Sequence, residues 1–243
     1  MPPRPKLSPG DSPPLILIPT SLEQSRLEDL GGFGAAAKDV HLAGFGAVAA
    51  AARTAELIAR LDPSRVLLVG IAGSFEPDIL GVGQAACFDN VIMHGIGAWD
   101  SSEADERNLR LPSALGFPQW NAKSAADTEQ ASADPERRTT DIWEQLPLHD
   151  PTPGSGHSLL TVCAATGDHE SAARLQTRYP GIMAEDMEAF GAALACSLTG
   201  RSLTVVRGIS NRVGDRDPRA WRIDDALAAA RELALTCLEL KAE

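Results

Sequence analysis

The chain contains the run VLLVGIAGS at residues 66–74. Its first half, from Val66 to Val69, is continuously apolar and rich in valine and leucine, which is typical of a strand buried on both faces of a sheet. Its second half, from Gly70 to Ser74, is either a plain turn or a segment whose glycines let the backbone approach a ligand closely. Open α/β sheets bind ligands at the carboxyl ends of their strands, so we expect a site here.

Segments with strand character alternate with segments of helical character on both sides of this run. An apolar segment at residues 15–18 precedes a helical pattern, and an alanine-rich helical pattern at residues 47–61 precedes Val66. Further strands are predicted at residues 84–93, 159–165, 182–184 and 203–209, and further helices at 170–178, 188–198 and 223–241. This order predicts a three-layer α/β fold in which helices flank a central, mostly parallel sheet.

The composition predicts one domain at residues 15–243. Residues 1–14 hold six prolines and no apolar core, so we expect a disordered tail that cannot serve as a secretory signal. Residues 99–158 combine turn formers with scattered charges, which predicts a long irregular excursion over the surface. The four cysteines are widely separated in apolar contexts, which indicates free thiols in a reducing cytoplasm and no metal site.

The charge balance narrows the class of ligand. The chain has 33 acidic and 22 basic residues, a formal net charge of −11, which repels nucleic acid and anionic membrane surfaces. The longest apolar runs are also too short for a membrane-spanning helix. We therefore expect no nucleic-acid or membrane partner, and a small-molecule substrate.

A glycine motif at residues 44–49, with the sequence GFGAVA, formally matches the dinucleotide-binding fingerprint. In that fingerprint an acidic residue ends the second strand and binds the ribose. Here Asp62 precedes the strand that begins at Val66, so the ribose has no partner. The motif therefore favours close packing of a helix over dinucleotide binding.

Four further short motifs follow one another along the chain, and their combination in this order is a specific signature. They are GIAGS at 70–74, TGD at 166–168, MEA at 187–189 and RGISN at 207–211. Through them the chain resembles the purine nucleoside phosphorylase and nucleosidase superfamily over about residues 15 to 240. The segment ISNRVGDRD at 209–217 is most similar to the futalosine hydrolases, which remove hypoxanthine from futalosine in menaquinone biosynthesis.

This resemblance implies a nucleoside phosphorylase-like fold, a homo-oligomer, and cleavage of an N-ribosidic bond without a metal or an organic cofactor. Such cleavage develops positive charge on the sugar and negative charge on the departing purine. The family's sugar-binding pair falls on Met187 and Glu188, whose thioether and carboxylate suit the ribose ring and its hydroxyls. Glu23 falls where hydrolytic members keep the carboxylate that activates water. Acids at such positions are otherwise ordinary residues of a helix's first turn.

Asn211 is the residue that discriminates between purines in this interpretation. Nucleosidases that act on 6-aminopurines carry an aspartate here, whereas an asparagine can accept from N7–H and donate to a 6-oxo group. Glu170 is a candidate acceptor for the N1 proton of 6-oxopurines, or else a solvated helix residue. The remaining candidates for substrate binding are Gly73, Ser74, Ser210 and Arg212.

The attacking group is predicted to be water. Bacterial phosphorylases of this fold carry an arginine before the glycine run to hold phosphate, whereas this chain has Leu67, Leu68 and Val69 there. Arg212 or Arg216 is a candidate for the benzoate carboxylate of futalosine. The alternatives are a methylthioadenosine/adenosylhomocysteine nucleosidase, a purine nucleoside phosphorylase, and a nucleoside-binding protein without turnover.

Overall fold

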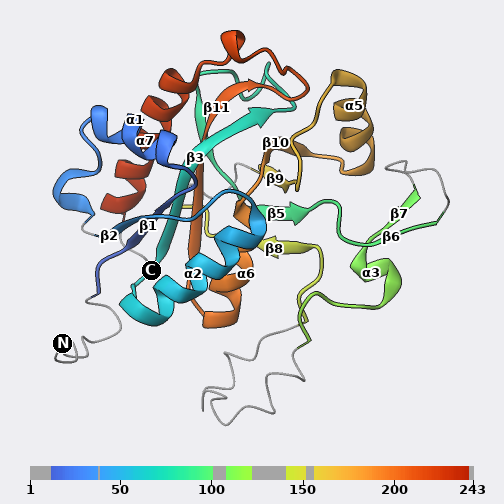
Figure 1. The fold of residues 1–243 in the computed structure, drawn as a ribbon, viewed down its shortest axis with the longest axis horizontal. Coiled ribbons are helices and arrows are strands. Elements are labelled where there is room, and N and C mark those ends of the chain that lie inside the picture. Colours follow the sequence, from blue (N-terminus) through green and yellow to red (C-terminus); the bar gives the residue numbers. More distant parts are fainter. Residues whose placement is uncertain (1–11, 38, 101–107, 122–140, 152–155, 241–243) are drawn as a thin grey trace.

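The structure is a computed structural model that describes residues 12–37, 39–100, 108–121, 141–151 and 156–240. Its centre is a sheet with the strand order β2-β1-β3-β10-β9-β5-β8, to which β11 is added beside β3 and β4 beside β11 (Figure 1). The strands are β1 (Leu15–Ile18), β2 (Asp39–Leu42), β3 (Val66–Ser74), β4 (Ala85–Cys87), β5 (Asn90–Met93), β8 (Gln145–Pro147), β9 (Ser158–Thr161), β10 (Ile182–Asp186) and β11 (Leu203–Arg212).

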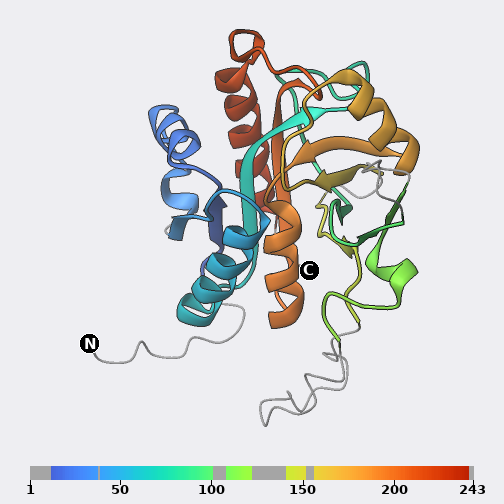
Figure 2. The same cartoon turned by 45° about the vertical axis from the view of Figure 1, so that its right-hand side comes forward.

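Helices cover both faces of this sheet, as Figures 1 and 2 show. Helices α2 (Ala47–Leu61) and α6 (Ala189–Thr199) pack together on one face, and α7 (Ile223–Glu239) packs on the other face beside α1 (Ser21–Asp29). Helix α5 (His169–Arg178) covers a smaller third cluster. β3 pairs in parallel with β1 and β11, and β9 pairs in parallel with β5 and β10. The predicted three-layer fold with a mostly parallel sheet is confirmed.

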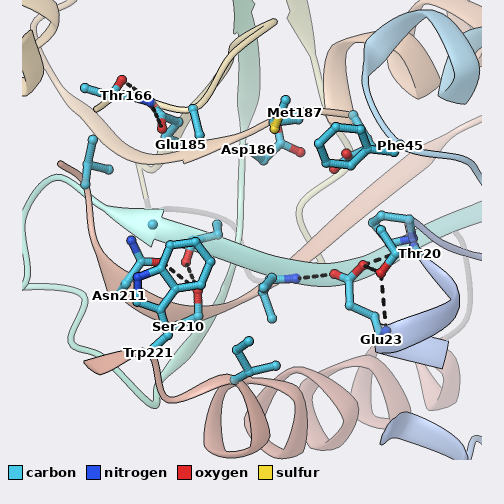
Figure 3. A pocket seen from close by; sticks show the side chains of 18 of the residues that line it. Thr20, Glu23, Phe45, Thr166, Glu185, Asp186, Met187, Ser210, Asn211 and Trp221 are labelled. Atoms are coloured by element: carbon cyan, nitrogen blue, oxygen red, sulfur yellow. Dashed lines mark hydrogen bonds between the residues drawn. The ribbon is translucent and has the colours of Figure 1, made fainter. Parts of the chain in front are cut away.

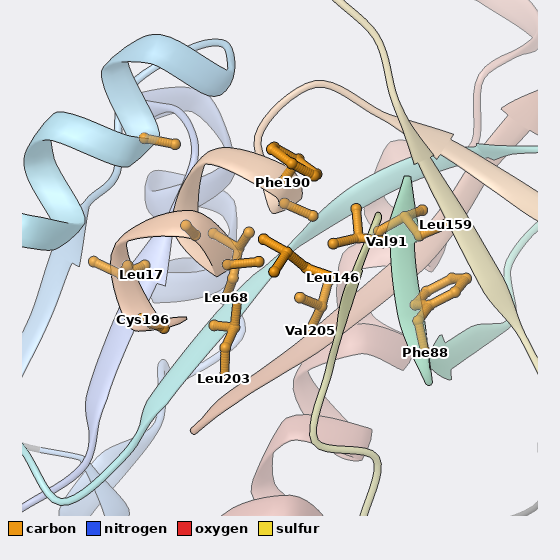
Figure 4. Packing of buried hydrophobic residues seen from close by; sticks show 14 of the residues in the cluster. Leu17, Leu68, Phe88, Val91, Leu146, Leu159, Phe190, Cys196, Leu203 and Val205 are labelled. Carbon is orange, nitrogen blue, oxygen red and sulfur yellow. The ribbon is translucent and has the colours of Figure 1, made fainter. Parts of the chain in front are cut away.

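The core follows the alternation of side chains along the strands. In β1, Leu15 and Leu17 belong to the cluster under α2 and α6, whereas Ile16 and Ile18 belong to the cluster under α7. Successive strand residues point to opposite faces, so a strand buried on both faces reads as one apolar run. Figure 4 shows the first cluster, where Phe190 and Cys196 of α6 meet the sheet.

Three details of the sheet differ from the prediction. The glycine-rich half of residues 66–74 is neither a turn nor a loop, because β11 pairs with β3 along its whole length. The strand predicted at residues 84–93 is two strands: β4 pairs with β11, and β5 pairs with β9. Strand β2, which the sequence analysis missed, is a half-buried edge strand and carries no long apolar run.

The excursion at residues 99–158 is described only in part. It contains the short pair β6 (Ala98–Trp99) and β7 (Leu109–Arg110), the short helix α3 (Pro112–Leu115) and strand β8. The predicted tail lies almost wholly outside the described residues. Among the described helices, none is long and apolar enough to cross a membrane.

Candidate active site

A cavity of about 330 Å³ opens where the carboxyl-terminal parts of β3, β10 and β11 meet (Figure 3). The start of α1, the loop before α2 and the loop after β11 complete its wall. It is lined by Pro19, Thr20, Leu22, Glu23, Phe45, Ile71, Ala72, Gly73, Ala165, Thr166, Glu185, Asp186, Met187, Glu188, Ser210, Asn211, Val213, Gly214, Arg216, Trp221 and Ile223. The site expected at the end of the VLLVGIAGS strand therefore coincides with a cavity.

Glu23 lies at one end of this cavity and is held by three donors. Its Oε1 accepts from the backbone N–H of Ile71 at 3.0 Å, and its Oε2 accepts from the N–H and the hydroxyl of Thr20. Thr20 in turn caps α1, so the helix start and the strand β3 fix the carboxylate together. Each carboxylate oxygen can accept more than one hydrogen bond, so Glu23 retains capacity for a water or a substrate.

Glu188 lies beside a buried arginine. Arg207, which is completely buried in β11, pairs with Asp186 and with Glu188, the latter at 3.3 Å. The other oxygen of Glu188 accepts from the backbone N–H of Gly46 at 3.0 Å. Burial raises the pKa of Glu188 to about 7, against the opposing effect of Arg207. The group is therefore a carboxyl that changes its charge close to neutral pH.

Asn211 lies at the opposite end of the cavity from Glu23, near Trp221 (Figure 3). Its Oδ1 accepts from the Ser210 hydroxyl at 2.7 Å, and its Nδ2 donates to the Arg212 carbonyl at 2.8 Å. A second contact of Nδ2, to the Asp215 carbonyl, is 3.5 Å long and lies at the outer limit of a hydrogen bond. The amide is thus oriented, with a further lone pair on oxygen and one weakly engaged N–H.

Glu185 faces the same end of the cavity as Asn211 (Figure 3). Its two oxygens accept from the backbone N–H and the hydroxyl of Thr166. Burial raises the pKa of Glu185 above its usual value, while the Thr166 hydrogen bonds and Arg216 lower it in part. A buried carboxyl here was not assigned a role from the sequence.

The structure places most of the predicted site residues at the cavity. The lining includes Glu23, Gly73, Met187, Glu188, Ser210 and Asn211. Three other predicted residues, Ser74, Glu170 and Arg212, do not line it. Ser74 is buried and accepts from the N–H of Glu76. The Glu170 side chain is 87% exposed and pairs with Arg174 one helical turn away, and Arg212 is an exposed residue at the end of β11. Of the two alternatives for Glu170, a base-binding acceptor or a solvated helix residue, its position favours the second.

Several lining residues escaped sequence reasoning. Phe45 belongs to the motif at residues 44–49, whose Gly46 N–H binds the protein's own carboxylate at Glu188 rather than a dinucleotide phosphate. Trp221 and Arg216 are close enough for a cation–π contact, with the guanidinium carbon 5.0 Å from the ring centre. Arg216 is one of the two arginines predicted as candidates for the benzoate carboxylate, and it does line the cavity, whereas the only signal for Trp221 in the sequence is that it follows Asn211. Trp99 and Trp120 do not line the cavity.

This fold and this cavity define a class of protein. Residues 38–240 match the family model described as the Phosphorylase superfamily, so the chain belongs to that superfamily. The family resemblance carried by the four motifs is confirmed.

Individual relatives are consistent with this membership. The chain is 35% identical to the futalosine hydrolase of Acidothermus cellulolyticus over 192 residues, which cover 79% of this chain and 71% of the relative. It is also 35% identical to the futalosine hydrolase of Streptomyces coelicolor over 153 residues, which cover 58% of this chain and only 62% of that relative. Among solved structures, the fold is similar to that of a 5'-methylthioadenosine/S-adenosylhomocysteine nucleosidase from Colwellia psychrerythraea in complex with adenine, with a TM-score of 0.66 and 20% identity. The superposition covers 94% of this chain and 95% of that chain. That likeness concerns the fold alone.

Proposed function

We propose that this protein is a futalosine hydrolase, which cleaves the N-ribosidic bond of futalosine with water and releases hypoxanthine and dehypoxanthine futalosine. The reaction belongs to menaquinone biosynthesis by the futalosine route. The observation that carries the proposal is one cavity with a fixed carboxylate, Glu23, at one end and an oriented amide, Asn211, at the other. The two futalosine hydrolases at 35% identity support the choice of substrate.

Glu23 acts on water in this mechanism. A general base must lie within hydrogen-bond reach of the proton that it removes. The three donors from Thr20 and Ile71 hold the Glu23 carboxylate at the cavity wall, at the end remote from Asn211. A water bound to this carboxylate attacks the anomeric carbon from the face opposite to the purine.

Met187 and Glu188 hold the sugar between these two ends. The Glu188 carboxylate accepts hydrogen bonds from the ribose hydroxyls, while Gly46 and Arg207 keep it in place. The Met187 thioether packs against the ring. The negative charge of Glu188 and Glu23 also stabilises the oxocarbenium character that the sugar develops.

Water, rather than phosphate, suits the charges around the sugar. Arg216 is the only cationic residue that lines the cavity in the described part of the chain, and it lies beside Trp221. Arg207 is buried and engaged by two carboxylates. The sugar end therefore presents Glu23 and Glu188 without a lining cation, which opposes the binding of a phosphate dianion.

The test is an incubation of the purified protein with futalosine, with and without inorganic phosphate, followed by identification of both products. We expect hypoxanthine and dehypoxanthine futalosine at the same rate in both reactions. Release of hypoxanthine only when phosphate is present, together with a sugar 1-phosphate, would instead establish a phosphorylase. A protein that binds futalosine and releases no base is a binding protein.

The raised pKa of Glu188 predicts how kcat/KM for futalosine depends on pH. Because its pKa is about 7 and the proposed role needs the carboxylate, kcat/KM for futalosine should fall as the pH is lowered through about 7. The Glu188→Gln variant has no carboxyl to titrate, so its residual activity should lack this acidic limb. An acidic limb near 4.5, the ordinary value for glutamate, would contradict the assignment.

Gly73 forms the floor of the cavity between Asn211 and Glu185. A Cβ there would lie 3.1 Å from Val213 Cγ2 and 3.5 Å from Asn211 Nδ2, and no positive φ prevents alanine at this position. We expect Gly73→Ala to raise KM for futalosine about 10-fold by displacing the base. Its unfolding free energy should change by about 1 kcal/mol or less.

Gly70→Ala is the matched comparison for this variant. A Cβ at Gly70 would clash with Arg207 and lie 2.7 Å from Glu23 Oε1, so both stability and activity should fall. Thermal unfolding and steady-state kinetics of the two variants check these expectations. Equal losses of stability in both variants would contradict the role of Gly73 as an open floor.

We also propose that the protein works in the cytoplasm as a homo-oligomer. Large apolar side chains lie exposed at the cavity mouth and on the adjoining helix, with Phe45 68% and Val48 86% exposed. Exposed apolar groups gathered near a site favour an interface between subunits. The molar mass from light scattering distinguishes an oligomer from a monomer.

A further inference from the structure

Three neighbouring strands bring Asn211, Gly73 and Glu185 into one row. In the register of the sheet, Gly73 of β3 pairs with Asn211 of β11 on one side and with Glu185 of β10 on the other. Adjacent strands lie about 4.8 Å apart, so the backbones at Asn211 and Glu185 are about 10 Å apart. Paired residues point to the same face of a sheet, and both side chains line the cavity.

This row forms a slot for the edge of a planar base. Gly73, in the middle, has no side chain, so the floor between the Asn211 amide and the Glu185 carboxyl stays open. Glu23 lies away from this row, at the sugar end (Figure 3). A nucleoside whose sugar lies against Glu23 and Glu188 therefore directs its purine toward the row.

Glu185 is oriented by the protein rather than by solvent. It is 7% exposed, and Thr166 donates to both of its oxygens, from its backbone N–H at 2.9 Å and from its hydroxyl. Each oxygen still has a lone pair for a ligand. Arg216, which lines the same cavity, favours the charged form of this carboxyl.

We propose that Glu185 is a specificity-determining residue that accepts a hydrogen bond from N1–H of a 6-oxopurine, while Asn211 binds N7 and the 6-oxo group. This inference rests on the proposed function and assigns the base end of the same site. A 6-oxopurine presents a donor at N1, whereas adenine presents a lone pair there. A carboxylate attracts the first and repels the second, so the pair of side chains selects hypoxanthine over adenine.

The row also explains why Glu170 is not needed for this contact. Glu170 is solvent-exposed on α5, whereas Glu185 already lies in the sheet next to Gly73. A purely structural role for Glu185, which would be to hold the loop at Thr166, predicts no dependence on the identity of the base. The two roles are therefore separable by experiment.

The experiment measures binding of hypoxanthine, 1-methylhypoxanthine and adenine by calorimetry to the wild type, Glu185→Gln and Glu185→Leu. The matched control is Glu170→Gln, which alters an exposed glutamate that does not line the cavity. We expect the wild type and the control to bind hypoxanthine about 10-fold to 100-fold more tightly than 1-methylhypoxanthine, because methylation removes the N1–H. In both Glu185 variants this ratio should fall at least several-fold, and the preference over adenine should fall with it.

Kinetics supply the second readout. The ratio of kcat/KM for futalosine to that for methylthioadenosine should fall about 10-fold or more in Glu185→Gln and stay unchanged in Glu170→Gln. Equal losses for both substrates, or unchanged ratios of base affinity, overturn the role of Glu185. A wild type that releases no hypoxanthine from futalosine refutes the proposed function instead, and the calorimetric ratios then still decide whether Glu185 reads N1–H.

Discussion

Glu23→Gln should lower kcat for futalosine about 10³-fold and leave the affinity for the nucleoside nearly unchanged. The amide keeps the size of the side chain and can still accept from Ile71, but it cannot take a proton from water. Single-turnover release of hypoxanthine measures the chemical step, and calorimetry with hypoxanthine measures binding at the far end of the cavity.

The matched control is Glu28→Gln on the same helix. Glu28 is exposed and accepts from Gln24, so its replacement should leave both kcat and affinity unchanged. Glu23→Gln also loses one acceptor of the Thr20 capping box, which should cost about 1 kcal/mol of unfolding free energy. If a folded Glu23→Gln variant kept more than a tenth of the wild-type kcat, Glu23 could not be the general base.

Asn211→Asp is the second change with a large expected effect, and it acts on substrate choice. The ratio of kcat/KM for futalosine to that for methylthioadenosine should fall about 100-fold. Nδ2 now faces the Arg212 carbonyl at 2.8 Å, and a carboxylate oxygen in its place would be repelled. This favours a protonated aspartic acid, which can donate to N7 but cannot donate to the 6-oxo group as the amide does.

Asn211→Leu provides the comparison for that variant, because it removes both the donor and the acceptor while filling a similar volume. It should lower kcat/KM for both nucleosides, whereas Asn211→Asp should lower only that for futalosine. Steady-state kinetics on the two substrates distinguish these patterns. An Asn211→Asp variant with an unchanged substrate ratio would show that the amide does not read the purine.

The sequence predicted the order of strands and helices well because buried parallel strands read as continuous apolar runs. Leu15–Ile18 and Val66–Val69 are both of this kind, and the alanine-rich helix at Ala47–Leu61 ends before Pro63. Glycine was the ambiguous signal. Gly70 and Gly73 were compatible with a turn or with a close approach to the backbone, and the structure shows that they continue β3, with Arg207 and Asn211 of β11 lying close to where a Cβ would be.

Site residues could be predicted where one short motif indicates both the residue type and its position at the end of a strand. Met187, Glu188 and Asn211 sit in such motifs, and all three line the cavity. The sequence could not decide in this way which of Glu170 and Glu185 lies nearer to the base. Their distances from the base depend on strand register and on the direction in which α5 leaves the sheet, and neither is encoded in local sequence pattern.

Competition between two nucleosides provides the decisive measurement. The protein is incubated with equimolar futalosine and methylthioadenosine, and the released bases are quantified before a tenth of either substrate is consumed. Under these conditions, the ratio of hypoxanthine to adenine equals the ratio of the two kcat/KM values. We expect hypoxanthine in at least about 100-fold excess. Adenine as the main base would contradict the assignment of Asn211 and Glu185 to a 6-oxopurine, and with it the proposed reaction.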